Sequence, residues 1–494
     1  MSSKESLQEL VQERLGDHLF VVVSNREPYY HEWAGDEIRC VVPASGLTTA
    51  LDPVMQACQG VWIAHGSGNA DREVVDDQDK VRVPPENPAY TVRRVWLTKE
   101  EEDGYYYGFA NDGLWPLCHV AYTRPSFKEA DWNTYKSVNE TFAEAVLQEV
   151  GDRRAFVFVQ DYHFTLLPRL IKERNPHIIV AQFWHIPWPN PEIVRICPWQ
   201  QDVLRGLLGN DLLGFHIRYY CDNFLNTVNW SLECRVDWEQ HEVSQRGRRT
   251  RVNSFPISID FDKVSRQAQQ PEVDAEMERL RKQLGLADEY IGVGIDRVDY
   301  TKGIPDRLRA IDCFFDKYPE YQRRLAFVQV GAQSRVHLGS YKRINAEIET
   351  LVETINWRYA SGAWAPIVYL RGNVPQLTIM ALERMSHFCI VSSLHDGMNL
   401  VAKEYVASRF DEDGVLILSP FTGAARELTD AILVNPYATD QMAEAIKEAI
   451  EMRPRERRQR MRALRSVVAE GNIYKWAEDI ASELPKLGRG RKWS

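Results

Sequence analysis

Short runs of apolar residues, rich in Val, Ile and Phe, recur along the chain and are separated by longer stretches with amphipathic spacing. Runs that are apolar throughout, rather than alternating, are typical of strands buried on both faces of a parallel sheet. Strands that alternate with helices indicate βαβ units and an α/β fold. The strands predicted in this way are 19–26, 155–163, 178–185, 211–216, 290–297, 325–331, 367–372, 388–393 and 415–420.

The length of the chain, 494 residues, favours two large domains over one core. The break is predicted near 253–264, after a polar stretch (239–251) that has the turn chemistry of a β-hairpin tip. We therefore predict two doubly wound, Rossmann-like lobes with flanking segments. The ranges are an N-terminal amphipathic extension 1–18, lobes 19–255 and 256–470, and a C-terminal helix and tail 471–494 that can pack back across either lobe.

Composition narrows the class of protein. Hydrophobic residues (44%) and charged residues (26%) are in the balance of a folded, soluble protein. A net charge of -10 argues against general nucleic-acid binding, which depends on neutralising phosphates, and the basic stretch 453–465 is interpreted as a solvated helix face. The eight cysteines form no CxxC pair or Cys/His cluster, so neither a zinc site nor a disulfide framework is indicated. No signal-peptide core or membrane-spanning stretch is evident, so a cytoplasmic protein without a membrane partner is expected.

Polar groups stand where several predicted strands end. In open parallel sheets, ligands bind beyond the carboxyl ends of the strands. Facing lobes would therefore gather these strand ends into one ligand-binding cleft. The strand ends are Ser24-Asn25-Arg26, Asp161-Tyr162-His163, His185, the segment from Asp296 to Lys302, Gln333-Ser334-Arg335 and His395-Asp396-Gly397.

The segment 392–407 is the most informative of these. Gly397 permits a tight turn after the strand, and a helix is predicted from Met398 onward. The free N–H groups at a helix N-terminus bind a phosphate or a sugar oxygen. Glu404, about two turns beyond Asp396, could accept hydrogen bonds from vicinal ribose hydroxyls. The alternative is an ordinary core helix capped by Asp396.

Cations form a second pattern. Arg297 and Lys302 could stabilise the negative charge that develops on a departing diphosphate, although an Arg-x-Asp-x-x-Lys string also suits a surface ion-pair network. Arg26 and Arg335, from different lobes, could clamp another anion, because Arg grips phosphate bidentately. His185 could equally be a satisfied structural histidine. Asp161 could equally cap the helix predicted near Phe164.

Taken together, the segments described above resemble motifs of the trehalose-6-phosphate synthase family of retaining glycosyltransferases, which have the two-lobed GT-B fold. The resemblance runs from about Phe20 to Leu484 and is most specific in the stretch DGMNLVAKEYVA. The matching strings are VVSNR (22–26), LWPLCH (114–119), DYH (161–163), HIPWP (185–189), DLLGFH (211–216), RVDYTKG (297–303), DGMNLVAKEYVA (396–407) and VNPY (434–437).

The resemblance implies a role for each matching residue. Arg297 and Lys302 would hold the nucleotide diphosphate, and Glu404 would bind the ribose. The donor sugar and diphosphate would further contact His185, Asp396 and the backbone at Gly46, Gly397, Met398, Asn399, Leu400 and Val401. The acceptor would be held by Arg26, Tyr106, Trp115, Arg335 and Asp161. The family needs no metal and no enzymic nucleophile, because the leaving phosphate accepts the proton of the attacking hydroxyl. No Asp-x-Asp stands at a strand end here, and DREVVDDQD (71–79) is interpreted as a solvated loop.

The chain departs from the family pattern in three places. Ser45-Gly46 stands where the family has paired glycines, His65-Gly66 stands where a second tryptophan is usual, and His395 replaces an arginine before the Asp-Gly-Met string. The donor-binding residues are thus intact, whereas the acceptor pocket differs.

Three functions are weighed on this basis. The first is synthesis of trehalose 6-phosphate from a nucleotide-glucose, such as UDP-glucose, and glucose 6-phosphate. The second uses glycerol 3-phosphate as the acceptor and makes glucosylglycerol phosphate; the spacing of Tyr106 and Trp115 favours the first. The third is a catalytically silent sugar-phosphate sensor, which would be expected to have lost Arg297, Lys302, Asp396 or Glu404. The sequence leaves open the nucleotide base and the oligomeric state, a homo-oligomer included.

Overall fold

The computed structural model describes residues 2–43, 46–285, 290–335 and 338–487. The chain divides into two compact units. Unit 1 comprises Met1–Ile257 together with Ile473–Ser494, and unit 2 comprises Ser258–Asn472. The sequence placed these divisions after residues 255 and 470.

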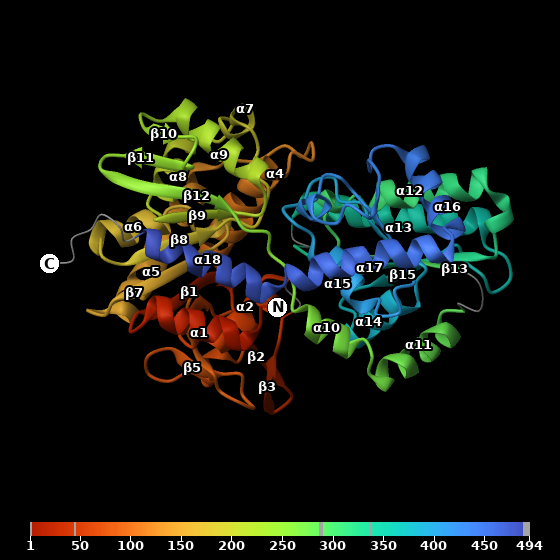
Figure 1. Ribbon diagram of the computed structural model, residues 1–494, viewed down its shortest axis with the longest axis horizontal. Coiled ribbons are helices and arrows are strands. Elements are labelled where there is room, and N and C mark those ends of the chain that lie inside the picture. The colour runs from red at the N-terminus through yellow and green to blue at the C-terminus, as the bar shows by residue number, and fades with distance from the viewer. Residues whose placement is uncertain (1, 44–45, 286–289, 336–337, 488–494) are drawn as a thin grey trace. The chain divides into compact units, whose positions relative to one another are not determined.

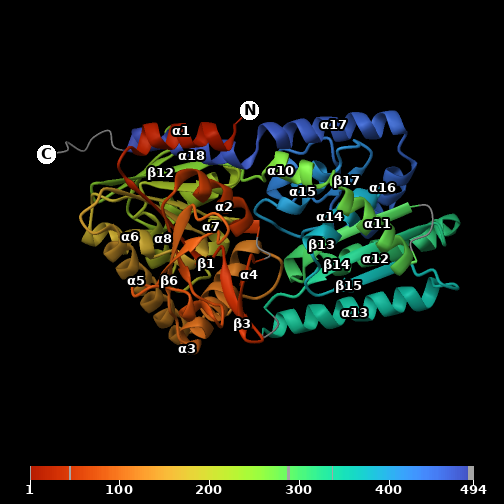
Figure 2. The same cartoon turned by 90° about the horizontal axis from the view of Figure 1, so that it is seen from below.

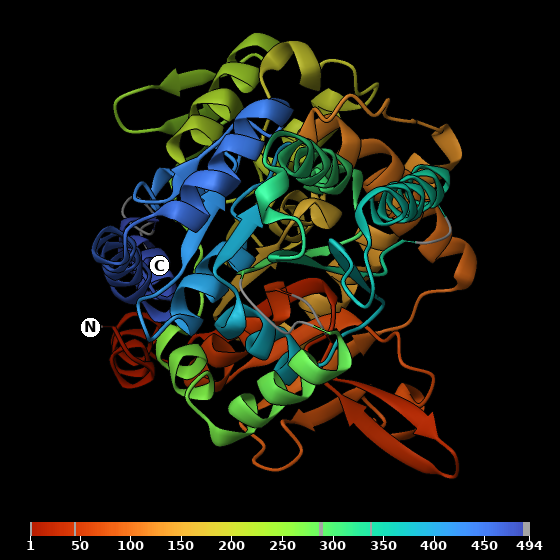
Figure 3. The ribbon, with the colours of Figure 1, turned by 90° about the vertical axis from the view of Figure 1, so that its right-hand side faces the viewer.

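Unit 1 is built on a sheet whose central strands are parallel (Figure 1). Strand β1 pairs with β4 on one side and with β7 on the other. Beyond β4 lies β6, and beyond β7 lie β8 and β9, so the strand order reverses between β1 and β7. Antiparallel strands extend both edges, and β2 and β3 form a separate hairpin, which Figure 3 shows in red at its lower right. The strands are β1 (Leu19–Arg26), β2 (Tyr30–Ala34), β3 (Glu37–Val41), β4 (Val61–His65), β5 (Lys80–Val83), β6 (Tyr90–Val95), β7 (Ala155–Gln160), β8 (Ile179–Phe183), β9 (Leu212–Phe215), β10 (Arg235–Asp237), β11 (Glu242–Gln245) and β12 (Arg248–Ser254).

The first and last helices of the described chain pack together in unit 1, where Figure 2 shows α1 alongside α18. Ser3 caps α1, and Leu7 is buried. Trp476 of α18 contacts the rings of Phe158 and Phe183, which fixes this helix on the sheet. The helices are α1 (Lys4–Leu15), α2 (Gly46–Cys58), α3 (Lys99–Glu102), α4 (Trp115–His119), α5 (Glu129–Val150), α6 (Leu167–Arg174), α7 (Pro191–Val194), α8 (Gln200–Leu207), α9 (Arg218–Ser231) and α18 (Ile473–Leu487), with 3₁₀ turns η1 (Asp71–Glu73) and η3 (Tyr162–Phe164) and a π-helix, η2 (Asp103–Leu114).

Unit 2 contains a parallel sheet in the order β15-β14-β13-β16-β17-β18, so its strand order reverses between β13 and β16. Figure 2 shows α13 running beside β15. The strands are β13 (Tyr290–Arg297), β14 (Leu325–Ala332), β15 (Ile367–Arg371), β16 (Phe388–Val391), β17 (Val415–Leu418) and β18 (Ile432–Leu433). The helices are α10 (Phe261–Gln267), α11 (Pro271–Gln283), α12 (Ile304–Lys317), α13 (Gly339–Tyr359), α14 (Gln376–Met385), α15 (Leu400–Ser408), α16 (Thr439–Glu451) and α17 (Pro454–Glu470), with 3₁₀ turns η4 (Tyr300–Lys302), η5 (Pro319–Tyr321) and η6 (Gly423–Arg426).

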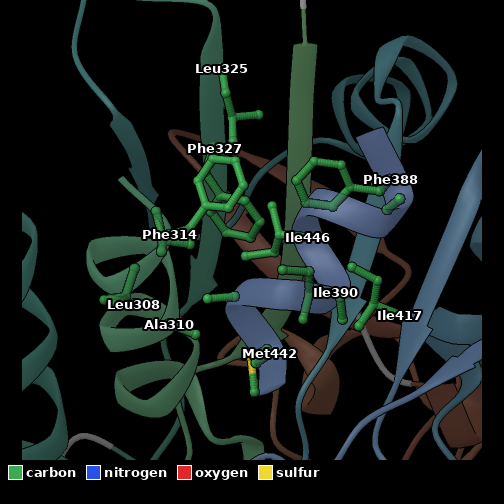
Figure 4. Packing of buried hydrophobic residues seen from close by; sticks show 14 of the residues in the cluster. Leu308, Ala310, Phe314, Leu325, Phe327, Phe388, Ile390, Ile417, Met442 and Ile446 are labelled. Atoms are coloured by element: carbon green, nitrogen blue, oxygen red, sulfur yellow. The ribbon is translucent and has the colours of Figure 1, made fainter. Parts of the chain in front are cut away.

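The core of unit 2 lies between this sheet and helices α12 and α16 (Figure 4). Phe314 of α12 and Ile446 of α16 face Phe327 of β14 and Phe388 of β16, and all four side chains are fully buried. Burying an aromatic or branched aliphatic side chain of this size stabilises the fold by about 1.5–3 kcal/mol. This packing fixes the strands whose carboxyl ends carry the site.

Each strand predicted from the apolar runs is present, and the hairpin tip is confirmed between β11 and β12 at Arg246 and Gly247. One interpretation was wrong and another holds only in part. Asp71, placed in a solvated loop, is fully buried and pairs with Arg94. The stretch 453–465 is only partly a solvated face, because Arg465 is half-buried and donates to backbone carbonyls. No helix in the described ranges is long and apolar enough to span a bilayer.

Candidate functional site

The 392–399 turn of unit 2 links β16 to α15 and stands at the point where the strand order reverses. Because β13 and β16 are adjacent and parallel, the loops that follow them lie at the same edge of the sheet. The two loops are joined directly: Leu394 N donates to Thr301 O (2.7 Å), and Ser392 Oγ lies 3.1 Å from Lys302 O. Ligands of open α/β sheets bind at such a reversal.

Lys302 and Asp396 meet across these two loops. Lys302 Nζ donates to Asp396 Oδ2 at 2.5 Å, and both side chains are largely buried. The same oxygen accepts from Ser393 Oγ (3.1 Å) and Asn399 Nδ2 (3.1 Å). The ammonium group is therefore held at the turn that precedes α15. The structure thus places Lys302 at this turn, and its donor-binding role stays a prediction.

Asn399, and not Asp396, caps α15. Its Oδ1 accepts from Ala402 N (3.0 Å), and its backbone has the positive φ of 84° that an L-residue seldom adopts. The alternative in which Asp396 is an ordinary helix cap is therefore wrong, and α15 begins at Leu400 rather than at the predicted Met398. A strained backbone conformation at a polar residue is a common feature of ligand-binding turns.

Glycines allow the backbones around this turn to approach closely. A Cβ on Gly423 would lie 2.1 Å from Gly397 O, and one on Gly303, whose φ is 62°, would lie 2.2 Å from Ser392 O. Gly423 N and Ala424 N also donate to the turn, to Asp396 O (3.2 Å) and to the carbonyl of Met398 (2.9 Å). Only a residue without a side chain fits at either position.

Arg297 ends β13, where it pairs in register with Ala332 of β14. One residue earlier, the buried Asp296 carboxylate accepts from Arg307 Nη1 (2.8 Å). Arg307 also donates to Ser392 Oγ (3.0 Å), so this fully buried guanidinium joins the end of β13 to the end of β16. Sequence reasoning missed Arg307, since an arginine inside an amphipathic helix carries no signal of burial.

Arg335 is held within unit 2. Its Nη1 donates to Tyr341 Oη (2.6 Å) and lies 3.5 Å from Asp299 Oδ2, which also accepts from Tyr341 Oη (2.8 Å). The Arg335 side chain is 5% exposed and its φ is 45°. The phosphate-binding role predicted for Arg335 stays a prediction.

Glu404 is the fifth residue of α15, which begins directly after the 392–399 turn. Burial raises the pKa of Glu404 to about 7. Glu383 of the neighbouring α14 is fully buried, and its pKa is raised well above the ordinary value, first by burial and then by the charge of Glu404. Arg465 donates to Val406 O and Ala407 O (3.0 and 2.7 Å) at the other end of α15, where a cation complements the helix dipole.

In unit 1, predicted acceptor residues meet at the end of β1 and in the π-helix η2. Arg26 Nη2 donates to Tyr106 Oη at 3.3 Å, and the Tyr106 ring stacks on His163 (5.6 Å between centroids). Trp115 begins the next helix, is buried, and packs on the Tyr162 ring. The strand order of this sheet reverses between β1, which ends at Arg26, and β7, which Asp161 follows.

Asp161 and His185 are brought together at the ends of β7 and β8. Asp161 Oδ1 accepts from His185 N (3.2 Å), and Asp161 makes no side-chain cap to the following turn, so the capping alternative is wrong. The φ of 70° and ψ of 179° at Asp161 belong to a region that L-residues rarely adopt. Burial, with His216 and His163 nearby, lowers the pKa of His185 well below its usual value, so the ring is neutral at physiological pH.

A buried charged cluster that sequence reasoning missed stands next to Arg26. Arg94 is fully buried, and its guanidinium donates to Glu27 (2.9 Å) and contacts Asp71 (2.8 Å). Glu27 also accepts from Ser67 N (2.9 Å), in the loop that follows His65. Glu27 adjoins the SNR string, but a glutamate after a strand does not by itself indicate burial. The cluster fixes the loop in which the chain departs from the family pattern.

The other positions named from the sequence are placed as follows. Gly46 begins α2, and Ser45 lies outside the described residues. His65 ends β4, with Nδ1 3.2 Å from Val95 O, and His395 is partly exposed within the 392–399 turn. Leu400 and Val401 form the first turn of α15. Among the described residues, no three His, Cys, Asp or Glu side chains are grouped so that they could hold a metal ion.

Residues 18–486 match the family model described as glycosyltransferase family 20. The chain belongs to glycosyltransferase family 20. Its curated relatives in the family include a trehalose-6-phosphate synthase of Mycobacterium avium, 35% identical over 96% of both chains. A bifunctional trehalose-6-phosphate synthase/phosphatase of Thermoproteus tenax is 38% identical over 94% of this chain, which spans only 63% of that longer relative.

Solved structures confirm the predicted GT-B fold of this family 20 member. A trehalose-6-phosphate synthase structure superposes with a TM-score of 0.85 at 29% identity, covering 95% of this chain and 99% of that one. An E. coli structure bound with UDP-2-fluoro glucose gives a TM-score of 0.84 at 30% identity, covering 94% and 98%. A Burkholderia xenovorans alpha,alpha-trehalose-phosphate synthase in complex with glucose-6-phosphate gives 0.85 at 27% identity, covering 94% and 100%. The family predicted from the sequence is confirmed.

Proposed function

We propose that this chain is a retaining alpha,alpha-trehalose-phosphate synthase, which transfers glucose from UDP-glucose to glucose 6-phosphate and releases UDP. The proposal is carried by the contact of Lys302 with Asp396 at the strand-order reversal of unit 2. Solved relatives of this fold are described as bound with UDP-2-fluoro glucose and with glucose-6-phosphate. The Mycobacterium avium relative, which this chain matches over 96% of its length, is named trehalose-6-phosphate synthase.

The residues of unit 2 suit the donor. The free N–H groups at the start of α15 and the ammonium of Lys302 can bind a diphosphate, with Arg297 as the second cation. In the proposed reaction the bond from the anomeric carbon to the phosphate oxygen breaks, and a bond to the acceptor hydroxyl oxygen forms on the same face. The hydroxyl proton passes to the leaving phosphate. We assign the stabilisation of the leaving group to these two cations, and no metal enters the scheme.

The residues of unit 1 suit the acceptor. Arg26 and Tyr106 together offer a guanidinium and a phenol, which are donors for a phosphate group. The buried Trp115, which packs on the Tyr162 ring, is proposed to lie against the sugar ring of the acceptor together with Asp161. Arg335 is proposed as a further phosphate ligand, as its place in the family motif implies.

A donor-by-acceptor matrix tests the function. UDP-, GDP- and ADP-glucose are each incubated with glucose 6-phosphate or glycerol 3-phosphate, and the released nucleoside diphosphate and the sugar product are measured. Transfer is expected with UDP-glucose and glucose 6-phosphate. A preference for glycerol 3-phosphate would overturn the acceptor assignment, and nucleotide release in no combination would overturn the function.

The ionisation of Glu404 predicts a pH dependence of donor use. Two ribose hydroxyls can donate to a carboxylate but not equally to a carboxylic acid. Because the pKa of Glu404 is raised to about 7, the carboxylate is lost as the pH falls through 7. We expect kcat/KM for the donor to fall about tenfold per pH unit below that value, since the ionised fraction of Glu404 falls by that factor. Steady-state kinetics measured from about pH 5.5 to about pH 9, in steps of about half a pH unit, would detect this fall in kcat/KM.

Glu404→Gln is the control for that profile. The amide does not titrate, so the acid limb should disappear and donor kcat/KM should be low throughout. An unchanged acid limb in this variant would assign the titration to another group, such as Glu383, whose pKa is raised in part by the charge of Glu404.

A further inference from the structure

Gln160, the last residue of β7, has no exposed surface and contacts the imidazole of His185. Gln160 Oε1 lies 2.9 Å from His185 Nε2, while Gln160 Nε2 lies 3.4 Å from the carbonyl oxygen of Phe158. The amide is thus oriented at both ends, with its donor toward a backbone carbonyl and its acceptor toward the ring. An amide oxygen carries no proton, so the proton shared with the ring belongs to His185 Nε2.

The rest of His185 is also anchored. The backbone N–H of His185 donates to Asp161 Oδ1 (3.2 Å), and the backbone carbonyl oxygen of His185 lies 3.0 Å from His216 Nε2. No described residue makes a hydrogen bond to His185 Nδ1, and the side chain is partly exposed. In a neutral imidazole with its proton on Nε2, Nδ1 is an acceptor only.

We propose that Gln160 is a positioning residue that holds His185 as the Nε2–H tautomer, so that Nδ1 accepts a hydrogen bond from a hydroxyl of the donor sugar. The part that concerns the sugar rests on the proposed function, whereas the tautomer does not. Gln160 acts through His185 and does not itself touch the substrate in this scheme.

The surroundings keep the ring in the form that this role needs. The pKa of His185 is lowered, first by desolvation and then by His216 and His163, so the ring does not become an imidazolium at neutral pH. Asp161 is the carboxylate beside it and accepts from the backbone N–H rather than from the ring. An imidazolium would donate from both nitrogens and would repel the hydroxyl proton that Nδ1 is proposed to accept.

The tautomer of His185 can be determined by NMR in the absence of substrate. In protein labelled with ¹⁵N-histidine, the His185 signals, assigned by their loss in His185→Asn, are expected to show a protonated Nε2 and an unprotonated Nδ1. Gln160→Met keeps the length of the side chain but removes the acceptor, so the Nε2–H signal should exchange faster with water and a fraction of the ring should become Nδ1–H. Gln329→Met, which changes a buried strand glutamine of unit 2, should leave both nitrogens unchanged.

Kinetics then separate positioning from a merely structural role. Gln160→Met should lower kcat/KM for the donor about tenfold, the scale of one buried hydrogen bond, and leave the KM for glucose 6-phosphate unchanged. In Gln160→Glu the carboxylate can still accept from Nε2–H but favours the imidazolium. This variant should therefore lose donor kcat/KM at a higher pH than the wild type, whose loss below about pH 7 is attributed to Glu404. Thermal unfolding of each variant checks that the fold is kept.

Three results would overturn the proposal. A wild-type His185 protonated on Nδ1 would do so, and so would Gln160→Met with unaltered ring signals. If Gln160→Met lowered kcat/KM equally for the donor and for the acceptor, Gln160 would be a structural residue only. Failure of the proposed function can be told apart from failure of the tautomer assignment. In that case the donor-by-acceptor matrix would show no transfer, while the Nε2–H tautomer of His185 would still be observed.

Discussion

Arg297→Ala is expected to lower kcat about a thousandfold while the protein stays folded, because removing a preorganised group that stabilises developing charge costs on this scale. The side chain stands at the end of β13, beside the loop from which Lys302 reaches Asp396. With UDP as the leaving group, the transition state gains negative charge that Lys302 alone would have to balance. Steady-state kinetics with UDP-glucose and glucose 6-phosphate would measure the loss.

Two companion variants sharpen this test. Arg297→Lys keeps the charge but not the forked guanidinium, so an intermediate kcat is expected. Arg453→Ala removes an exposed arginine of the same unit, at the start of α17, and should leave kcat unchanged. Near-normal turnover in Arg297→Ala would remove the leaving-group role of this residue.

Gly423→Ala is expected to damage both the donor site and the stability of unit 2. The new Cβ would lie 2.1 Å from Gly397 O, 3.0 Å from the carbonyl carbon of Gly397 and 3.1 Å from Met398 Cα. These atoms are backbone and cannot rotate away as a flexible side chain would, so the 392–399 turn must shift. Overpacking of this kind costs about 1–3 kcal/mol. Because the turn presents the N–H groups at the start of α15, the KM for the donor should rise at least about tenfold, which corresponds to 1.4 kcal/mol.

Gly339→Ala is the matched control. A Cβ on Gly339 meets no atom within 4 Å, and the residue begins α13 in the same unit. Thermal unfolding should show a melting temperature lowered by a few degrees for Gly423→Ala and little changed for Gly339→Ala. A Gly423→Ala variant with unaltered donor KM and melting temperature would mean that the turn does not need this close approach.

The relation between sequence and structure differs from element to element. The strand ending at Arg297 was predicted with its observed bounds, because an uninterrupted apolar run followed by charged residues leaves little choice of conformation. The start of α15 was placed two residues early, because Asn399 caps this helix from a positive φ that composition does not reveal. The loop around Asp71 was misread because its acidic residues look solvated until Arg94 is placed beside them.

The sequence by itself determined the alternation of strands and helices, the division into two units and, through its motifs, the family. These follow from local patterns of apolar residues and from residues that are neighbours along the chain. Only the tertiary structure decided which distant groups meet, such as Lys302 with Asp396, Arg307 with Ser392 and Gln160 with His185. Such contacts depend on strand order and register, because parallel strands far apart in sequence bring their carboxyl ends to one edge of a sheet.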